Sequence, residues 1–374
     1  MRIEPFKMER LQSVWENIVE YNLSESGVHP VPLNEFVPEA DLDGLLRTGL
    51  GYSQSNGTPE LREEIRKLYP GSRLENILVT SGSAEANFIL IWSRVEPGDE
   101  VVFMMPNYMQ IRGLLGGFGA RVKSFFLKEK LDWAPDLGEL EKLVTAKTKM
   151  IIVTNPNNPT GAILSLEEMK MIVRLAESCG AWILADEVYR GAERDGPMTP
   201  SFWGMTERVI VTGGLSKAYG LPGLRIGWIV GPEDQVLKTW PYHDYTTICP
   251  SLLSDKLARI ALSEEARGKI LARTRRILLR NYPVIEEWLE KHSRLFHCVP
   301  PRAGAICYLG YDLNINSTDL AEKLIREKSV LIVPGDHFEM DGYLRIGFGS
   351  DEALLRTALS RIDELLSSLQ SKRG

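Results

Sequence analysis

The residues around Lys217 have the types and spacing that imine chemistry requires. A lysine that forms an imine needs a rigid, partly desolvated site with an anion anchor nearby, unlike an ordinary solvated ammonium. The segment Gly213–Trp228 supplies glycines that let the backbone approach a ligand, the hydroxyl of Ser216, and the cation of Arg225. A glycine-rich loop with a surface lysine is the ordinary alternative. The combination favours an aldehyde cofactor with a phosphate group, which is the description of pyridoxal phosphate (PLP).

Composition narrows the class of protein. The chain has 374 residues, 44% of them hydrophobic, and a formal net charge of -6. This length suits one large or two medium domains, and the acidic balance gives no reason to expect nucleic acid or a membrane surface as a partner. The sequence shows no apolar run of membrane-spanning length and no signal peptide, and its four cysteines lack metal-ligand spacing. We therefore expect a cytoplasmic protein without a metal site.

Short apolar runs alternate with amphipathic stretches between about residues 75 and 230, which predicts an α/β fold with crossover helices such as Leu166–Cys179. The predicted strands are Asn76–Thr80, Glu100–Met104, Arg121–Phe126, Met150–Thr154, Trp182–Ala185, Arg208–Thr212 and Arg225–Val230. Ligands bind beyond the carboxyl ends of such strands. Gly82, Asn158, Asp186 and Lys217 each follow one of them, so the sequence predicts a shared site at that edge.

The pattern changes in the last third of the chain. One long helix is predicted over Leu252–Glu290, followed by a small α+β unit. Its predicted strands are Ala305–Leu309 and Val330–Val333, and its predicted helices are Ser317–Glu327 and Glu352–Ser368. We expect a large domain over residues 31–285 and a small domain formed by residues 1–30 and 286–374.

Four segments occur in an order that resembles one known family. They are Asn155–Gly161 (Asn-Pro-Asn-Asn-Pro-Thr-Gly), Ala185–Gly191 (Ala-Asp-Glu-Val-Tyr-Arg-Gly), the lysine segment, and Leu344–Phe348 (Leu-Arg-Ile-Gly-Phe). From about Tyr52 onward the chain resembles the class I/II aminotransferases, which are fold-type I PLP enzymes. The resemblance implies a large domain with a mostly parallel seven-stranded sheet, a small α+β domain, and PLP as cofactor.

PLP requires an imine partner, a phosphate cup, an acid near the ring nitrogen and a lid on the ring face. Gly82, Ser83 and Ala84 follow a strand and open a helix, where backbone N–H groups can hold a phosphate; an ordinary capped helix is the alternative. The resemblance makes this turn the phosphate cup, completed by Ser216 and Arg225. Asp186 ends an apolar run, and a protonated ring nitrogen would be a suitable partner for its carboxylate.

The resemblance implies further roles. Tyr189 and Asn158 would hydrogen-bond the ring 3-oxygen, with Asn158 also near the substrate carboxylate, and Tyr108 would stack on the ring. Arg345 lies in an apolar strand and would bind the substrate carboxylate, although a structural salt bridge is a serious alternative. Tyr52 would reach the phosphate of a neighbouring subunit, which implies a homodimer with shared active sites.

The segment Asn22–Pro30 departs from the family pattern. Glu25 and His29 stand where most relatives have small or apolar residues, as in a capreomycidine-synthase-like offshoot that acts on arginine-type substrates by elimination and cyclisation. His29 would then be an extra catalytic acid–base group and Glu25 a substrate contact; packing of a loop is the equal alternative. Glu9 belongs to the same site or to a helix surface. A second departure is Gly214, where the family often has a serine for the phosphate.

The sequence thus predicts a PLP-dependent aminotransferase that moves the amino group of an L-amino acid to a 2-oxo acid through a Lys217 aldimine. The first alternative is β/γ-elimination or cyclisation of an arginine-type amino acid. A catalytically dead regulator is disfavoured because the lysine, aspartate, asparagine and both arginines occur together. A dinucleotide-binding dehydrogenase is disfavoured because Ser81–Ala84 does not supply the glycine pattern that it needs.

Overall fold

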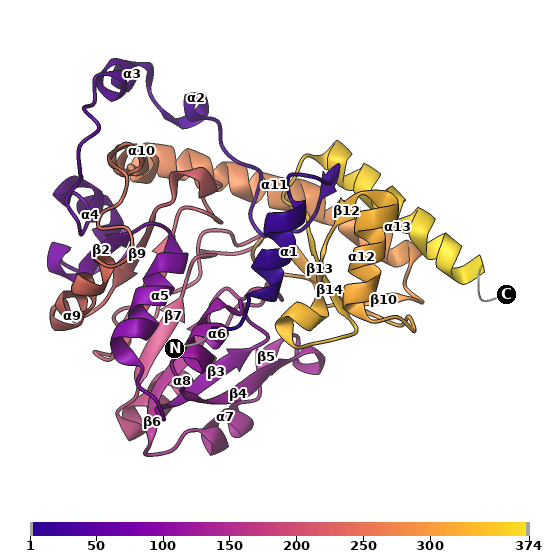
Figure 1. Ribbon diagram of the computed structural model, residues 1–374, viewed down its shortest axis with the longest axis horizontal. Helices are drawn as coiled ribbons and strands as arrows, with labels where there is room; N and C mark the ends of the chain where they lie inside the picture. The colour runs from indigo at the N-terminus through magenta and orange to yellow at the C-terminus, as the bar shows by residue number, and fades with distance from the viewer. Residues whose placement is uncertain (1–2, 372–374) are drawn as a thin grey trace.

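A computed structural model describes residues 3–371 (Figure 1). Its largest element is an eight-stranded sheet with the order β2-β9-β8-β7-β6-β3-β4-β5. The strands are β2 (Ile77–Thr80), β3 (Glu100–Met105), β4 (Arg121–Lys128), β5 (Ala134–Pro135), β6 (Thr148–Thr154), β7 (Trp182–Asp186), β8 (Val209–Gly214) and β9 (Gly227–Val230). The seven predicted strands are all present, and the two-residue β5 adds an eighth at the edge.

The central pairings of this sheet are parallel, from β8 through β7, β6 and β3 to β4. β9 runs antiparallel to both of its neighbours, and β5 runs antiparallel to β4. The sequence therefore predicted a mostly parallel sheet correctly. It missed β5 because a strand of two residues has no periodicity to detect.

Alternating side chains of the strands pack on opposite faces, as strand geometry requires. Ile152 belongs to one hydrophobic cluster, whereas Ile151 and Val153 belong to the other. Helices on both faces bury these strands, which explains their continuous apolar character. The helices are α1 (Lys7–Trp15), α2 (Leu33–Phe36), α3 (Glu39–Leu46), α4 (Pro59–Arg66), α5 (Ser83–Arg94), α6 (Gln110–Gly117), α7 (Leu137–Leu143), α8 (Leu166–Cys179), α9 (Glu233–His243), α10 (Leu252–Leu262), α11 (Glu264–Lys291), α12 (Ser317–Lys328) and α13 (Glu352–Ser371).

The predicted helix Leu252–Glu290 is two helices, α10 and α11. Ser263 separates them with an extended backbone (φ -54°, ψ 147°) and forms the end of one helix and the cap of the next. Serine followed by Glu264 and Glu265 is a helix-start signal, because serine is favoured at the cap and acids in the first turn. The predicted domain boundary after residue 285 falls inside the continuous helix α11.

A second, four-stranded antiparallel sheet has the order β10-β11-β14-β13. Its strands are β10 (Phe296–Cys298), β11 (Ile306–Tyr311), β13 (Val333–Pro334) and β14 (Tyr343–Gly347). A separate pair joins β1 (Tyr21–Asn22) to β12 (Val330–Leu331) in parallel. The predicted strand Val330–Val333 is thus two strands that belong to different sheets, and the N-terminal segment packs against the C-terminal unit.

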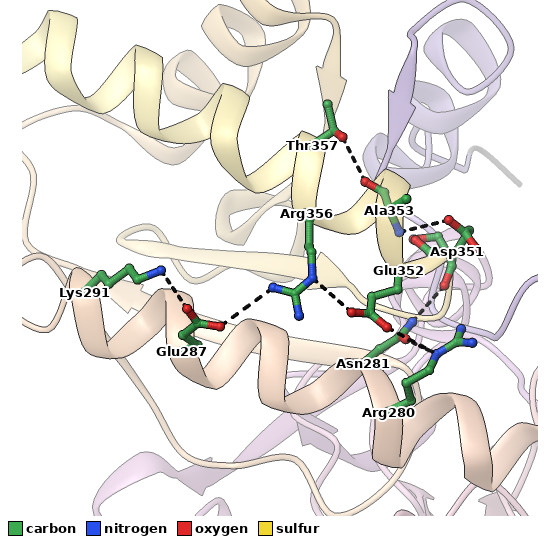
Figure 2. A network of polar contacts seen from close by, with 10 residues as sticks. Arg280, Asn281, Glu287, Lys291, Asp351, Glu352, Ala353, Arg356 and Thr357 are labelled. Carbon is green, nitrogen blue, oxygen red and sulfur yellow. Dashed lines mark hydrogen bonds and ion pairs between the residues drawn. The ribbon is translucent and has the colours of Figure 1, made fainter.

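A polar network fastens α13 to the long helix α11 (Figure 2). The guanidinium of Arg356 contacts the carboxylates of Glu352 at 3.0 Å and Glu287 at 3.7 Å. Asn281 of α11 donates to the carbonyls of Phe348 and Ser350, just before α13 begins. α11 thereby fixes the end of β14, the strand that carries Arg345. No helix within residues 3–371 has the length and apolar character needed to cross a membrane.

Candidate active site

One cavity of about 320 Å³ gathers most of the predicted site residues. It lies at the carboxyl edge of the large sheet and is closed by α1, by the loop after β1 and by β14. The predicted residues that line it are Glu25, Ser83, Ala84, Tyr108, Asn158, Asp186, Tyr189, Ser216, Lys217, Arg225 and Arg345. Glu9 also lines the cavity. So do Gln12, Glu16 and Asn87, for which the sequence predicted no role.

Lys217 follows β8, and its side chain is 28% exposed. Its Nζ lies 3.7 Å from a carboxylate oxygen of Glu25. Burial alone would lower the pKa of Lys217, but the negative charge of Glu25 is the main influence against it, and the pKa lies above its usual value. Gly27 lets the N-terminal segment pass close by, because a Cβ there would lie 3.3 Å from the Lys217 Cα. The lysine is therefore held in a narrow, charged site.

The turn before α5 forms a cradle that a side chain would fill. Gly82 caps the helix with φ +87°, and a Cβ on it would lie 2.5 Å from Nη2 of Arg225. A Cβ on Gly227 would lie 2.3 Å from the Ser83 nitrogen. The first N–H groups of a helix have no acceptor within the helix, and Gly82 has no side chain to cap them. These N–H groups and the Arg225 guanidinium fit a phosphate group.

Asp186 is the last residue of β7 and is only 3% exposed. Its carboxylate accepts hydrogen bonds from Asn87 Nδ2 at 2.9 Å and from the Val188 nitrogen at 3.1 Å. Burial raises the pKa of Asp186. No ion pair to it occurs within residues 3–371, so a protonated ring nitrogen would supply the missing cation. Asn87 lies one helical turn after Ser83, and this spacing could have revealed it.

Arg345 is the most deeply buried cation of the site, at 1% exposure. Its Nη1 donates to Asn158 Oδ1 at 2.8 Å and its Nη2 donates to the Ser24 carbonyl, while its Nε has no partner among the described residues. Burial lowers the pKa of Arg345. No carboxylate forms an ion pair with it in the described part of the chain. The guanidinium therefore fits an anionic ligand, and the salt-bridge alternative loses its support.

Two tyrosines border the same cavity. Tyr189 donates to Ser26 Oγ at 2.7 Å, and Tyr108 donates to Glu9 Oε1 at 2.8 Å. Burial, reinforced by the Glu9 carboxylate, raises the pKa of Tyr108. Tyr108 therefore remains protonated, and both phenols act as hydrogen-bond donors to these neighbours.

Three predicted residues do not line the cavity. Gly82 shapes it from behind, through its contact with Arg225. The His29 ring instead lies 3.0 Å from the Gly349 carbonyl through Nδ1, so the chain brings Glu25 to the cavity but turns His29 away. Tyr52 is 87% exposed, beside a separate hollow lined by Leu50, Thr247 and Cys249 among others. Its predicted contact with a second subunit cannot be made within one chain.

Comparison with known proteins agrees with this geometry. Residues 23–362 match the family described as aminotransferase class I and II. The chain is 32% identical to capreomycidine synthase of Streptomyces vinaceus, over 93% of this chain and 90% of the relative. It is 30% identical to an aspartate aminotransferase of Thermotoga maritima, over 92% and 90% respectively. A PLP-dependent aminotransferase from Streptococcus suis superimposes with a TM-score of 0.92 and 32% identity, covering 99% of both chains.

These matches identify the class of protein. The chain belongs to the class I and II aminotransferase family, and its large sheet and C-terminal unit form the fold-type I architecture. It is an enzyme that transfers amino groups.

Proposed function

We propose that this cavity binds PLP and that the enzyme moves the amino group of an L-amino acid to a 2-oxo acid there. The observation that supports this most directly is the meeting of Lys217, Asp186 and the Arg225–Gly82 cradle around one cavity. PLP supplies an aldehyde for the amino group and a ring that withdraws electrons from the substrate's α-carbon.

The residues of the large sheet hold the cofactor. The N–H groups of Ser83 and Ala84, the Ser216 hydroxyl and the Arg225 guanidinium bind the phosphate. Asp186 would accept a hydrogen bond from the ring nitrogen and so keep that nitrogen protonated. Tyr189 and Asn158 would hydrogen-bond the ring 3-oxygen, and Tyr108 would pack on the ring face.

Two residues act on the substrate. Arg345, with Asn158, binds the α-carboxylate and so orients the α-proton toward Lys217. Lys217 Nζ would take that proton from the α-carbon, which requires the neutral amine, and the resulting ammonium would then give a proton up again. Its raised pKa comes partly from Glu25, so ligand binding must weaken the Lys217–Glu25 contact before the amine can act.

A second candidate function is β/γ-elimination or cyclisation of an arginine-type amino acid. It is favoured by Glu25, whose carboxylate lies beside Lys217 in the cavity, and by the likeness to capreomycidine synthase. His29 gives it no support, since its ring does not border the cavity. Measurement of released ammonia and of 2-oxo acid from the same substrate separates the two reactions.

We further propose that the enzyme works in the cytoplasm as a homodimer, with Tyr52 reaching the phosphate of the partner's site. Support comes from large apolar or aromatic side chains that stay exposed in or next to the two segments of chain that line the hollow beside Tyr52, namely Leu46, Leu50, Tyr245 and Ile248. The division into a large domain (residues 31–285) and a small one (1–30 and 286–374) also remains a proposal, supported by the two separate sheets.

The cofactor proposal predicts a yellow protein that borohydride labels at Lys217. Purified protein is reconstituted with PLP, reduced, digested and mapped by mass spectrometry. Lys217→Ala should lose the label and the visible absorbance, whereas the exposed Lys238→Ala should keep both. A label on another lysine, or no binding after reconstitution, contradicts the assignment.

A further inference from the structure

Glu9 and Gln12 of α1 border the cavity, together with Glu16, the residue that caps the C-terminal end of this helix. Spacings of three and four residues place side chains on one side of a helix. Gln12 anchors this face by donating to the carbonyl and hydroxyl of Ser24 at 3.1 and 3.0 Å, and Glu9 is held by Tyr108. With Glu25 from the loop after β1, the N-terminal segment therefore places three carboxylates around the cavity.

Glu16 lacks the partners that the others have. No hydrogen bond or ion pair to its carboxylate is found in the described part of the chain. Burial raises the pKa of Glu16, and repulsion from Glu25 and Glu9 raises it further. Glu25 remains 56% exposed although it lies beside Lys217. The cavity thus holds clustered negative charge that a ligand can still reach.

Under the proposed function, each cation that lines the cavity already binds the cofactor or another part of the substrate. Arg225 faces the phosphate cradle. Arg345 has a buried, unpartnered Nε and suits the α-carboxylate. Lys217 must leave Glu25 in order to bond the cofactor and move the α-proton. With Asp186 matched to the ring nitrogen, Glu9, Glu16 and Glu25 remain without a cation.

Arg345 is the independent observation that points to an amino acid here. It fixes the carboxylate end of the substrate, and Lys217 fixes the amino end. The side chain is the only part of the substrate left to meet the carboxylates of the N-terminal segment.

We propose that the amino donor has a cationic side chain, a guanidinium or an ammonium, and that Glu16 and Glu25, with Glu9 beside them, bind it. This inference rests on the proposed function of the same site. The carboxylates attract a cationic side chain and repel the second carboxylate of an acidic donor. They therefore favour cationic donors and also exclude acidic ones. They neither form nor break a bond, and they act on specificity alone.

The test pairs each cationic donor with a neutral analogue. L-arginine is compared with L-citrulline, its neutral ureido analogue, and L-lysine with L-norleucine; L-aspartate serves as the acidic donor. With PLP-loaded enzyme, we expect kcat/KM for each cationic donor to exceed that of its neutral partner by about tenfold or more, the size expected for a hydrogen bond to a charged group. Calorimetry measures binding of arginine and citrulline to the same preparation.

Variants assign the effect to the cluster. Glu16→Gln should remove most of the arginine preference and leave citrulline unchanged, and its melting temperature reports folding. Glu20→Gln is the control, because it makes the same charge change at an exposed position outside the cavity. It should keep the full preference.

The outcomes separate this inference from the function on which it rests. Equal binding of arginine and citrulline, or a preference for aspartate, overturns the cationic side chain while amino transfer stands. Tight, charge-dependent binding of arginine without 2-oxo acid formation supports the inference and contradicts transamination. A lost preference in Glu20→Gln as well as Glu16→Gln would show a general effect of net charge and overturn the assignment to the cavity.

Discussion

Two groups of carboxylates in this molecule have opposite surroundings. In the network between α11 and α13, Glu287 pairs with Lys291 at 2.8 Å, and Glu352 pairs with Arg356 at 3.0 Å (Figure 2). In the cavity, Glu16 has no such partner within residues 3–371, and Glu25 forms an ion pair there only with Lys217, which the proposed reaction also requires. Exposed pairs contribute little energy but define a geometry, whereas clustered carboxylates without cations cost stability until a ligand arrives. The comparison distinguishes carboxylates that stabilise the fold from carboxylates that we propose to bind the substrate.

The largest effect should come from the two cavity arginines, which also lack carboxylate partners among the residues that the structure describes. Arg345→Ala should raise the KM of the amino donor by roughly 10- to 100-fold, because it removes a charge-assisted contact of about 1.5–3 kcal/mol. Arg225→Ala should weaken PLP affinity by a similar factor. Donor kinetics at saturating PLP and cofactor titration by absorbance measure the two effects.

Each variant serves as the control for the other. Arg345→Ala should leave PLP affinity nearly intact, since its guanidinium contacts Asn158 and Ser24 and lies away from the phosphate cradle. An exchanged pattern would mean that the two roles are reversed.

The sequence predicted the parts of this site that lie on regular elements. Asp186 and Lys217 follow strands whose apolar runs are unmistakable, and α8 begins and ends where its pattern indicates, from the Ser165 cap to Gly180. Glu16 and Gln12 were missed because only the tertiary packing of α1 brings them to the cavity. Gln12 lies three residues after Glu9 and Glu16 lies seven after it. Because Glu9 was already a candidate, this helical spacing could have identified both.

The N-terminal loop shows where such reasoning fails. Glu25 and His29 were considered together as ionisable residues in an unusual segment. The chain separates them because the backbone nitrogen and the ring of His29 both contact the Gly349 carbonyl, which ties the loop to the segment after β14. A contact between residues so far apart in sequence leaves no local signal, and neither does the split of Val330–Val333 between two sheets.

A smaller effect, on stability, should come from Asp186. Its folded pKa is raised by burial, so the folded chain holds this proton more tightly than the unfolded chain. The cost of burying the charge is therefore absent at low pH and appears as pH rises above about 4, the ordinary pKa of aspartate, and through the folded pKa. Without PLP, Asp186→Asn should melt a little higher than the parent at neutral pH, with the difference shrinking toward pH 4.

With PLP present the order should reverse, because the variant loses the carboxylate that pairs with the ring nitrogen. The exposed Asp244→Asn is the matched control and should show neither effect. Melting temperatures of the cofactor-free and loaded proteins across pH 4–8 provide the measurement. A variant that is less stable than the parent without cofactor would show that Asn87 and Val188 fully compensate the buried charge.

The smallest effect should come from the paired carboxylates. Arg356→Ala removes the cation shared by Glu287 and Glu352, yet we expect a loss of only about 0.2–1 kcal/mol in the free energy of unfolding, as for other exposed pairs. Urea denaturation measures it, with Arg326→Ala as control, since Arg326 forms one exposed pair with Glu322 on α12. High salt should reduce the effect of both changes, because it screens exposed charges.

Donor specificity should stay unaltered in Arg356→Ala. A loss well above 1 kcal/mol, or a changed preference between arginine and citrulline, would mean that the Arg356 pairs, and not only Asn281, position β14 and Arg345. The contrast between structural and ligand-binding carboxylates would then no longer hold.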